Sequence, residues 1–146
     1  MSKKTRQKHR ILLLIAFAIL GYAASFYSPQ QTDGSAPGQN AETLYEQQQS
    51  NQQLEVTGQI IKLLTDDHVG RRHQRFIIKL EGGLTLLVAH NIDLAPRINS
   101  ISKGDSVQFY GEYEWNNKGG VVHWTHRDPN GNHIGGWLKH NRRVYQ

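Results

Sequence analysis

A chain of 146 residues leaves room for one folded domain. Its net charge of +5 is concentrated in the first ten residues. From Leu54 onward twelve Lys and Arg stand against nine Asp and Glu, so no broad basic surface for a polyanion is evident. Cysteine is absent, which excludes disulfides, a thiolate nucleophile and thiolate metal ligands.

The first 27 residues have the pattern of a signal peptide or signal anchor. Residues 1–10 are basic and residues 11–27 carry no charge, a run at the short end of the roughly 17 to 25 residues that span a bilayer. The basic flank should stay in the cytoplasm, so the rest of the chain should be extracytoplasmic. Small residues at cleavage spacing leave two outcomes open. The protein is either anchored by this helix at the periplasmic face of the inner membrane, with the membrane as its partner, or periplasmic or secreted after cleavage.

Residues 28–53 are rich in Gln, Ser, Asn, Gly and Pro, and we interpret them as a polar flexible linker. Asn40 could cap a short helix reaching Tyr45 or Gln49, but such a helix would be marginal without a partner. The linker leaves residues 54–146 as the folded domain.

The pattern from Leu54 onward alternates apolar and polar residues between Gly and Asp turn signals, which favours strands over helices. Five strands are predicted, at residues 55–64, 74–80, 84–90, 106–115 and 121–126. The sequence therefore predicts an all-β fold: a small five-stranded OB-fold-like barrel preceded by an N-terminal hydrophobic helix and a polar linker. Another small barrel or a sandwich is the alternative.

Four segments carry a resemblance to a known family. They are residues 66–76 (DDHVGRRHQRF), 89–96 (AHNIDLAP), 111–116 (GEYEWN) and 123–126 (HWTH). Together they resemble a small bacterial family described as domain of unknown function 3465. The similarity covers nearly all of residues 54–146, so it supports the domain boundary, but it implies no established activity.

The barrel topology brings polar residues together at one pole, because strands one, three and five of an OB-fold run in the same direction. The residues at this pole are Asp66, Asp67, Arg71, Arg72 and His73 from the first connection, His90, Asn91 and Asp93 from the end of the third strand, and His126 from the fifth.

A divalent metal such as zinc is the cofactor that this pole could hold. Residues 128–131 (DPNG) predict a turn that would place His126 opposite His133, with Cβ atoms about 5 Å apart. Two imidazoles at that spacing can share one metal, and His90 is the expected third ligand. His123 is less favoured, because a step of three residues along a strand reverses the face. The alternative is a hydrogen-bonded polar rim without metal.

A ligand surface is predicted beside the pole, since the second strand carries His73 and Arg75 on the face that OB-folds commonly use for oligonucleotides and oligosaccharides. Arginine binds phosphate or carboxylate groups through paired hydrogen bonds, and exposed aromatic rings can stack on bases or sugars. The predicted ligand-binding residues are Arg71, His73, Arg75, His90, Asn91, Tyr110 and Trp124. The alternative for the arginine-rich segment is a solvated turn.

The leading functional hypothesis is an extracytoplasmic binding module for an anionic or oligomeric ligand, an oligonucleotide or an oligosaccharide. The rival is a metal-assisted hydrolase, such as a phosphodiesterase or nuclease, so enzymatic activity is left open. Its candidate catalytic residues are Asp66, Asp67 and Asp93 for a cation, Arg71 or Arg75 for phosphate charge, and His73 or His90 for proton transfer. A purely structural envelope protein is a third hypothesis, and the sequence indicates no protein partner.

Overall fold

The structure, a computed structural model, describes residues 40–146. The predicted hydrophobic helix at 1–27 and residues 28–39 of the predicted linker lie outside the described residues. Within the described residues, no helix has the length and apolar character needed to cross a bilayer.

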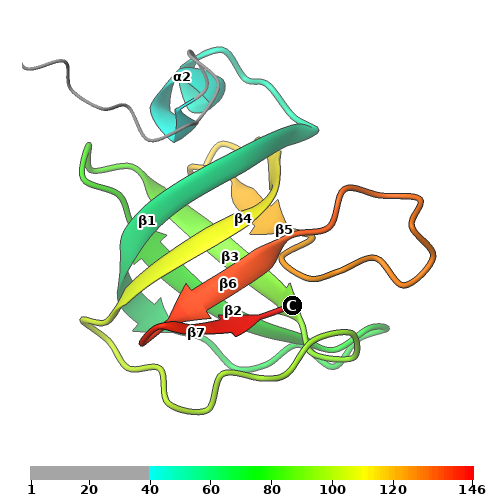
Figure 1. Ribbon diagram of the computed structural model, residues 1–146. Helices are drawn as coiled ribbons and strands as arrows, with labels where there is room; N and C mark the ends of the chain where they lie inside the picture. Colours follow the sequence, from blue (N-terminus) through cyan, green and yellow to red (C-terminus); the bar gives the residue numbers. More distant parts are fainter. Residues whose placement is uncertain (1–39) are drawn as a thin grey trace, which may run out of the picture. The chain divides into compact units, whose positions relative to one another are not determined.

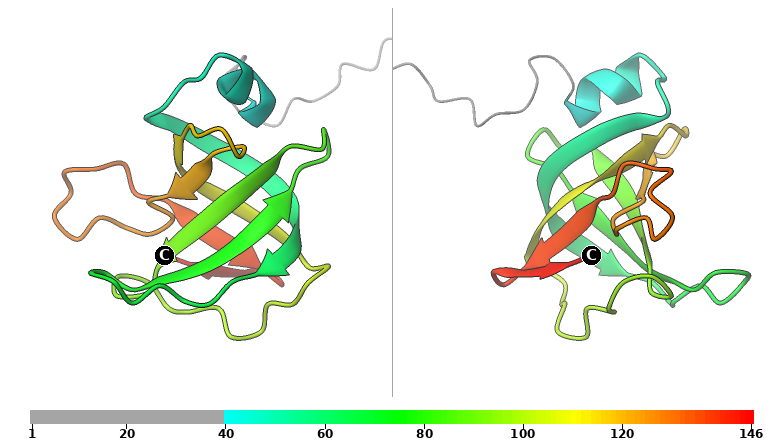
Figure 2. Two further views of the ribbon diagram at one scale, coloured as in Figure 1. Left: turned by 180° about the vertical axis from the view of Figure 1, so that it is seen from behind. Right: turned by 45° about the vertical axis from the view of Figure 1, so that its right-hand side comes forward.

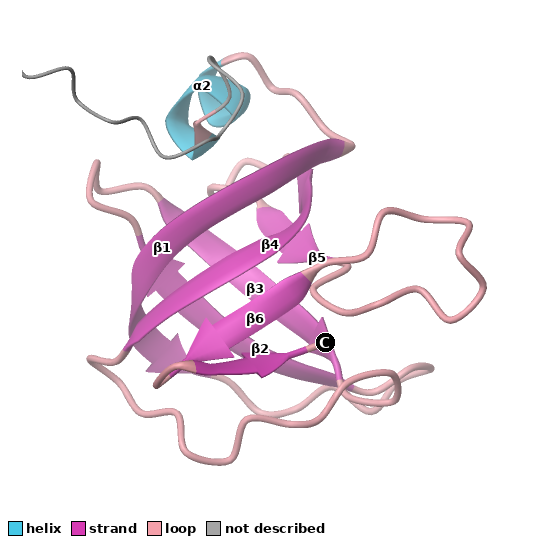
Figure 3. Cartoon of the chain, in the orientation of Figure 1, coloured by secondary structure: helices cyan, strands magenta, loops and turns pink. Residues whose placement is uncertain are grey.

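Residues 40–146 form a short helix and seven strands (Figures 1 and 3). These elements are α2 (Ala41–Glu46), β1 (Gln52–Leu63), β2 (His73–Lys79), β3 (Thr85–Asn91), β4 (Ser106–Glu114), β5 (Val121–His123), β6 (Trp137–His140) and β7 (Arg143–Tyr145).

The sheet has the order β1-β2-β3-β5-β4-β6-β7, and an additional β1–β4 pairing closes the first five strands into a barrel. The strands of this barrel are antiparallel except for the parallel pair β3–β5, and β6 and β7 lie outside it. Figure 2 shows the barrel from two further sides. The predicted five-stranded OB-fold-like barrel is confirmed, and β6 and β7 are additions that were not predicted.

The barrel core follows the period-2 pattern of the sequence. Along β4, buried and partly exposed residues alternate, so Val107, Phe109 and Tyr113 face the core. In β1, Gly58 gives the close packing expected of a glycine in a curved strand, because a methyl group there would come within 2.8 Å of Ile78 Cδ1. The long strand β1 thereby pairs with both β2 and β4.

The helix α2 belongs to the folded domain. Asn40 caps it by accepting a hydrogen bond of 2.7 Å from a backbone N–H in the first turn. Ala41 and Leu44 are fully buried in the hydrophobic core, and the indole of Trp115 donates to the carbonyl of Tyr45 at 3.1 Å. The partner that the helix needed is thus the barrel itself. Residues 40–53, assigned to the linker from sequence, form this helix and the start of β1.

The fifth strand is shorter than predicted and ends at His123 instead of residue 126. Trp124 adopts a positive φ of 52°, which an extended strand cannot accommodate. The chain leaves the sheet there and forms the β5–β6 loop, residues 124–136, drawn in orange in Figure 1.

Candidate metal centre

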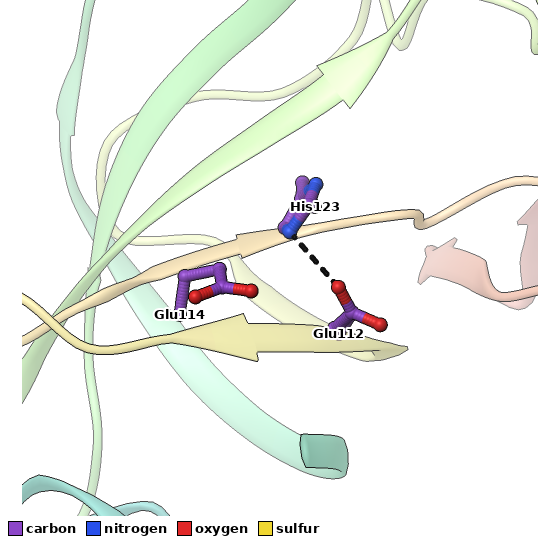
Figure 4. A group of neighbouring side chains, drawn as sticks. All are labelled: Glu112, Glu114 and His123. Atoms are coloured by element: carbon purple, nitrogen blue, oxygen red, sulfur yellow. Dashed lines mark ion pairs between the residues drawn. The ribbon is translucent and has the colours of Figure 1, made fainter. Parts of the chain in front are cut away.

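The hairpin of β4 and β5 carries a group of two carboxylates and one imidazole. Tyr113 faces the core, so its neighbours Glu112 and Glu114 point outward on the other face of β4. Residues 116–120 turn the chain into β5, and the strand register places His123 directly opposite Glu112. Figure 4 shows the three side chains gathered on one side of the two strands.

The spacing of these three residues suits a metal ion. One ligand atom from each of Glu112, Glu114 and His123 can be chosen so that all three lie within 4.8 Å of one another. His123 Nε2 lies 3.5 Å from Glu112 Oε1. Two ligands of a tetrahedral zinc, with bonds of about 2.1 Å, would be about 3.4 Å apart. The group could therefore hold a metal with little rearrangement.

The polar atoms of the group are incompletely satisfied. His123 Nε2 is buried and has no hydrogen-bond partner among the described residues; Glu112 Oε1, at 3.5 Å, is at ion-pair distance. Burial lowers the pKa of His123, although the carboxylates of Glu112 and Glu114 oppose this effect. The lowered pKa favours the neutral imidazole, the form that ligates a metal.

A groove of about 400 Å³ extends from this group across the outer face of the barrel. It crosses strands β4, β5, β3 and β2 in their order in the sheet. Glu114 and His123 line its end on β4 and β5, and the outward side chains of β3 and β5 line its apolar middle. Asp67, His73 and Arg75 line the far end.

Arg75 is held in place at the far end of the groove. Its Nε and Nη2 donate to the carbonyl of Thr65 at 3.2 and 3.0 Å, and its Nη1 lies 3.7 Å from Asp67 Oδ2. The guanidinium has further donors beyond the two that bind this carbonyl. The structure thus places Arg75, His73 and Asp67, all predicted as site residues, in one groove with the candidate metal ligands.

The histidines predicted to bind zinc have separate partners. His90 is fully buried, and its Nδ1 lies 2.9 Å from Thr125 Oγ1. His126 Nδ1 donates to the carbonyl of the next residue at 2.7 Å. His133 Nε2 lies 2.7 Å from Glu112 Oε2, beside the candidate metal group. The histidine that belongs to the group is His123, which the sequence analysis disfavoured.

The early end of β5 explains this difference. The predicted turn at 128–131 forms, with the amide of Gly131 donating to the carbonyl of Asp128 at 3.2 Å. Because Trp124 leaves the strand, the residues on either side of this turn are loop and not paired strands. The predicted cross-strand pair of His126 and His133 therefore does not form.

At the pole, two of the predicted aspartates form ion pairs with arginines. Arg72 Nε lies 2.6 Å from Asp93 Oδ1, and Arg97 Nε lies 2.7 Å from Asp66 Oδ2. The hydrogen bond from Arg97 lowers the pKa of Asp66. Arg71 is exposed in the same β1–β2 loop. The two connections meet as predicted, but Asp66 and Asp93 are already paired with arginines.

The remaining predicted ligand-binding residues are distributed over other parts of the barrel. Asn91 is buried and accepts a backbone hydrogen bond of 2.9 Å. Tyr110 stacks on Trp137 with ring centroids 6.5 Å apart. Trp124 stacks on the ring of His133 at 3.8 Å. None of the three is among the residues that line the groove.

The two glutamates were not predicted as metal ligands, because the pattern of histidines at strand ends pointed to His90, His126 and His133 instead. The alternation along β4 already placed Glu112 and Glu114 on one outward face. Counted from the turn, the hairpin register pairs Glu114 with Val121 first, Tyr113 with Val122 second and Glu112 with His123 third.

Comparison with known proteins gives a family and no activity. No curated protein matches the chain. A family model described as "Protein of unknown function (DUF3465)" matches residues 23–146, which include the whole described barrel and the helix α2. The chain therefore belongs to the DUF3465 family.

Proposed function

We propose that this barrel binds a divalent cation such as zinc through Glu112, Glu114 and His123, and that the bound cation recruits an anionic ligand into the groove. The observation that carries the proposal is the shared groove, which joins the metal-ligand group at one end to Arg75 at the other. Three protein ligands leave a coordination position open for water or a ligand group.

The charges that line the groove indicate that an anionic ligand would bind there only when a cation is present. Asp67 and Glu114 line it together with Arg75, so without metal the acidic groups offset the arginine. A bound divalent cation is the largest local charge in such a site and would make it attractive to phosphate or carboxylate. Arg75 would then bind a second anionic group or the same one from the opposite side.

The shape of the groove favours a ligand longer than a single ion. It crosses four strands, and its middle is lined by Leu87, Ala89 and Val121. An apolar middle between two charged ends suits an oligomer whose base or sugar rings lie over the aliphatic side chains. An oligonucleotide or an acidic oligosaccharide has this alternation of rings and anionic groups.

Binding experiments with defined probes test this function. The purified protein should bind a fluorescent single-stranded thymidine oligonucleotide or anionic cell-wall glycan fragments saturably at low salt when zinc is present. Chelation, or the variant Glu114→Gln, should abolish binding. Arg75→Gln should weaken it while zinc binding is retained. Zinc binding without saturable binding of either probe would refute the ligand proposal and leave the metal site intact.

A metal-assisted phosphodiesterase is the second candidate, because His73 and Asp67 line the same groove as the metal group. The cation would activate a water and polarise the phosphate, while Arg75 would stabilise the developing negative charge. His73 would take or give a proton.

Hydrolysis of bis(p-nitrophenyl) phosphate distinguishes the two functions. An enzyme would show zinc-dependent turnover that is lost in Arg75→Ala and in His73→Gln. A binding module would bind the oligonucleotide without turning over either phosphodiester. Asp93→Asn provides a control, because Asp93 pairs with Arg72 outside the groove.

We also propose that the barrel acts outside the cytoplasm, delivered by residues 1–27 as a signal peptide or a membrane anchor. The support is the basic flank followed by the uncharged run in the sequence. An alkaline phosphatase fusion after residue 53 should be active in intact bacteria. An inactive alkaline phosphatase fusion, together with an active fusion of a cytoplasmic reporter at the same residue, would refute this topology. N-terminal sequencing of the mature protein would distinguish an anchor from a cleaved signal peptide.

A further inference from the structure

The β5–β6 loop delivers a second histidine to the metal group. His133 Nε2 lies 2.7 Å from Glu112 Oε2, although the two residues are 21 positions apart in the chain. The ring of His133 also lies against Trp124, with ring centroids 3.8 Å apart and an angle of 10° between the planes. One edge of the imidazole thus contacts a candidate metal ligand, and its face is held by an aromatic ring.

The loop is organised around this placement. The carboxylate of Asp128 accepts hydrogen bonds from the backbone amides of Asn130, Asn132 and His133, at 3.1, 2.7 and 2.9 Å. The amide of Gly136 donates to a carbonyl at the start of the loop at 2.8 Å, which closes the loop at its base. His133 therefore reaches Glu112 from a loop fixed at several points.

The hydrogen bonds of His133 show how it could act on the metal. Its Nδ1 lies 2.7 Å from the carbonyl of Ile134, and because a carbonyl only accepts, this nitrogen donates. Its Nε2 faces the carboxylate of Glu112, which also only accepts, so both ring nitrogens donate and the ring is an imidazolium in this arrangement. Neither ring nitrogen is free to ligate the metal in this arrangement, so His133 would act through Glu112.

The two oxygens of Glu112 have different neighbours. Oε2 contacts His133, whereas Oε1 faces His123 Nε2 at 3.5 Å. Holding Oε2 fixes the rotation of the carboxylate and leaves Oε1 aimed at the position where a metal would sit. Carboxylate ligands in metal sites are commonly oriented by such outer hydrogen bonds.

We infer that His133 is a positioning residue of the metal centre: it orients Glu112 for coordination through Oε1, and the β5–β6 loop is thus a structural part of the site. This inference rests on the proposed metal site. Loss of such an outer partner typically lowers metal affinity about 10- to 100-fold.

Two substitutions separate positioning from direct ligation. In His133→Gln, the side-chain amide nitrogen can occupy the place of Nε2 and still donate to Glu112, whereas His133→Leu removes the donor. Zinc affinity of the full chain is measured by competition with a chromophoric chelator. We expect His133→Gln to bind within a few-fold of the wild type and His133→Leu to bind about 10- to 100-fold more weakly. Ile134→Ala, at an exposed side chain of the same loop, is the matched control and should be unchanged.

The visible spectrum of the cobalt-substituted protein gives the second measurement. It should be the same in the wild type and in His133→Gln, because the metal ligands are unchanged. Loss of zinc affinity in His133→Gln together with an altered cobalt spectrum would overturn the inference by making His133 a ligand. Unchanged affinity in His133→Leu would overturn it by making the contact merely structural. A wild-type protein that binds no metal would overturn both this inference and the proposed function.

Discussion

Protonation of the unfolded chain at His90 should lower the stability of the protein below pH 6.5. His90 is fully buried, and this burial lowers its pKa from the ordinary 6.5 to about 4. Between these two pH values the unfolded chain binds a proton at His90 and the folded protein does not. Because stability rises with pH wherever the unfolded state binds more protons, stability must be lost as pH falls through this window.

The size of the effect follows from the two pKa values. With 6.5 unfolded and about 4 folded, His90 should reduce the free energy of unfolding by about 2 kcal/mol between pH 7.5 and pH 5. The aspartates with lowered pKa, such as Asp66 and Asp105, act in the same direction at lower pH, because their ordinary value is 3.8. The window above pH 5 therefore isolates histidines.

Urea unfolding at pH 7.5 and pH 5 measures the effect. His90→Gln, which cannot titrate, should lose about 2 kcal/mol less than the wild type between these two pH values. The control His68→Gln removes an exposed histidine of the β1–β2 loop and should behave like the wild type. Equal pH dependence in the wild type and His90→Gln would refute the reasoning. If His90→Gln does not fold, an NMR titration of the wild type decides, because a His90 ring that titrates near pH 6.5 gives the same refutation.

Two other substitutions test the fold around the site. Gly136→Ala should lower the free energy of unfolding in urea by about 2 kcal/mol or more, because a methyl group there would overlap the carbonyl oxygen of Trp124. The neighbouring Gly135→Ala is the control. It should lower the free energy of unfolding less, because the nearest atom to its methyl group would be 3.4 Å away. Asn40→Ala should cost about 1 kcal/mol by removing the cap of α2. A full retention of stability in Asn40→Ala would indicate that α2 contributes nothing to the fold, contrary to the burial of Leu44.

Much of the barrel could be predicted because its signal is local. Alternation along residues 106–115 and a Gly-rich turn after them define β4 and the start of β5, and burial on one face fixes the register. The helix α2 was underestimated because only Ala41 and Leu44 carry its buried face, and their partner is the core of the barrel. A contact of that kind is not visible in a short polar segment.

The site was predicted less well than the fold because the backbone conformation of one residue, Trp124, shortens β5. The positive φ of Trp124 ends β5, and nothing in the amino-acid pattern of residues 121–126 signals it. A β5 extended to residue 126 predicts that His126 is the histidine facing a partner strand. With the strand ending at His123, the candidate site lies on the β4–β5 hairpin, where His123 stands opposite Glu112.

Zinc titration of the metal-free protein tests the central claim most directly. The wild type should bind one zinc per chain, and at a free zinc concentration of 100 times Kd its unfolding free energy should rise by about 2.7 kcal/mol. Glu114→Gln should lose most of this affinity, whereas the exposed Glu81→Gln should retain it. Equal zinc affinity in Glu114→Gln and Glu81→Gln, or no stabilisation of the wild type by zinc, would contradict the proposed metal centre.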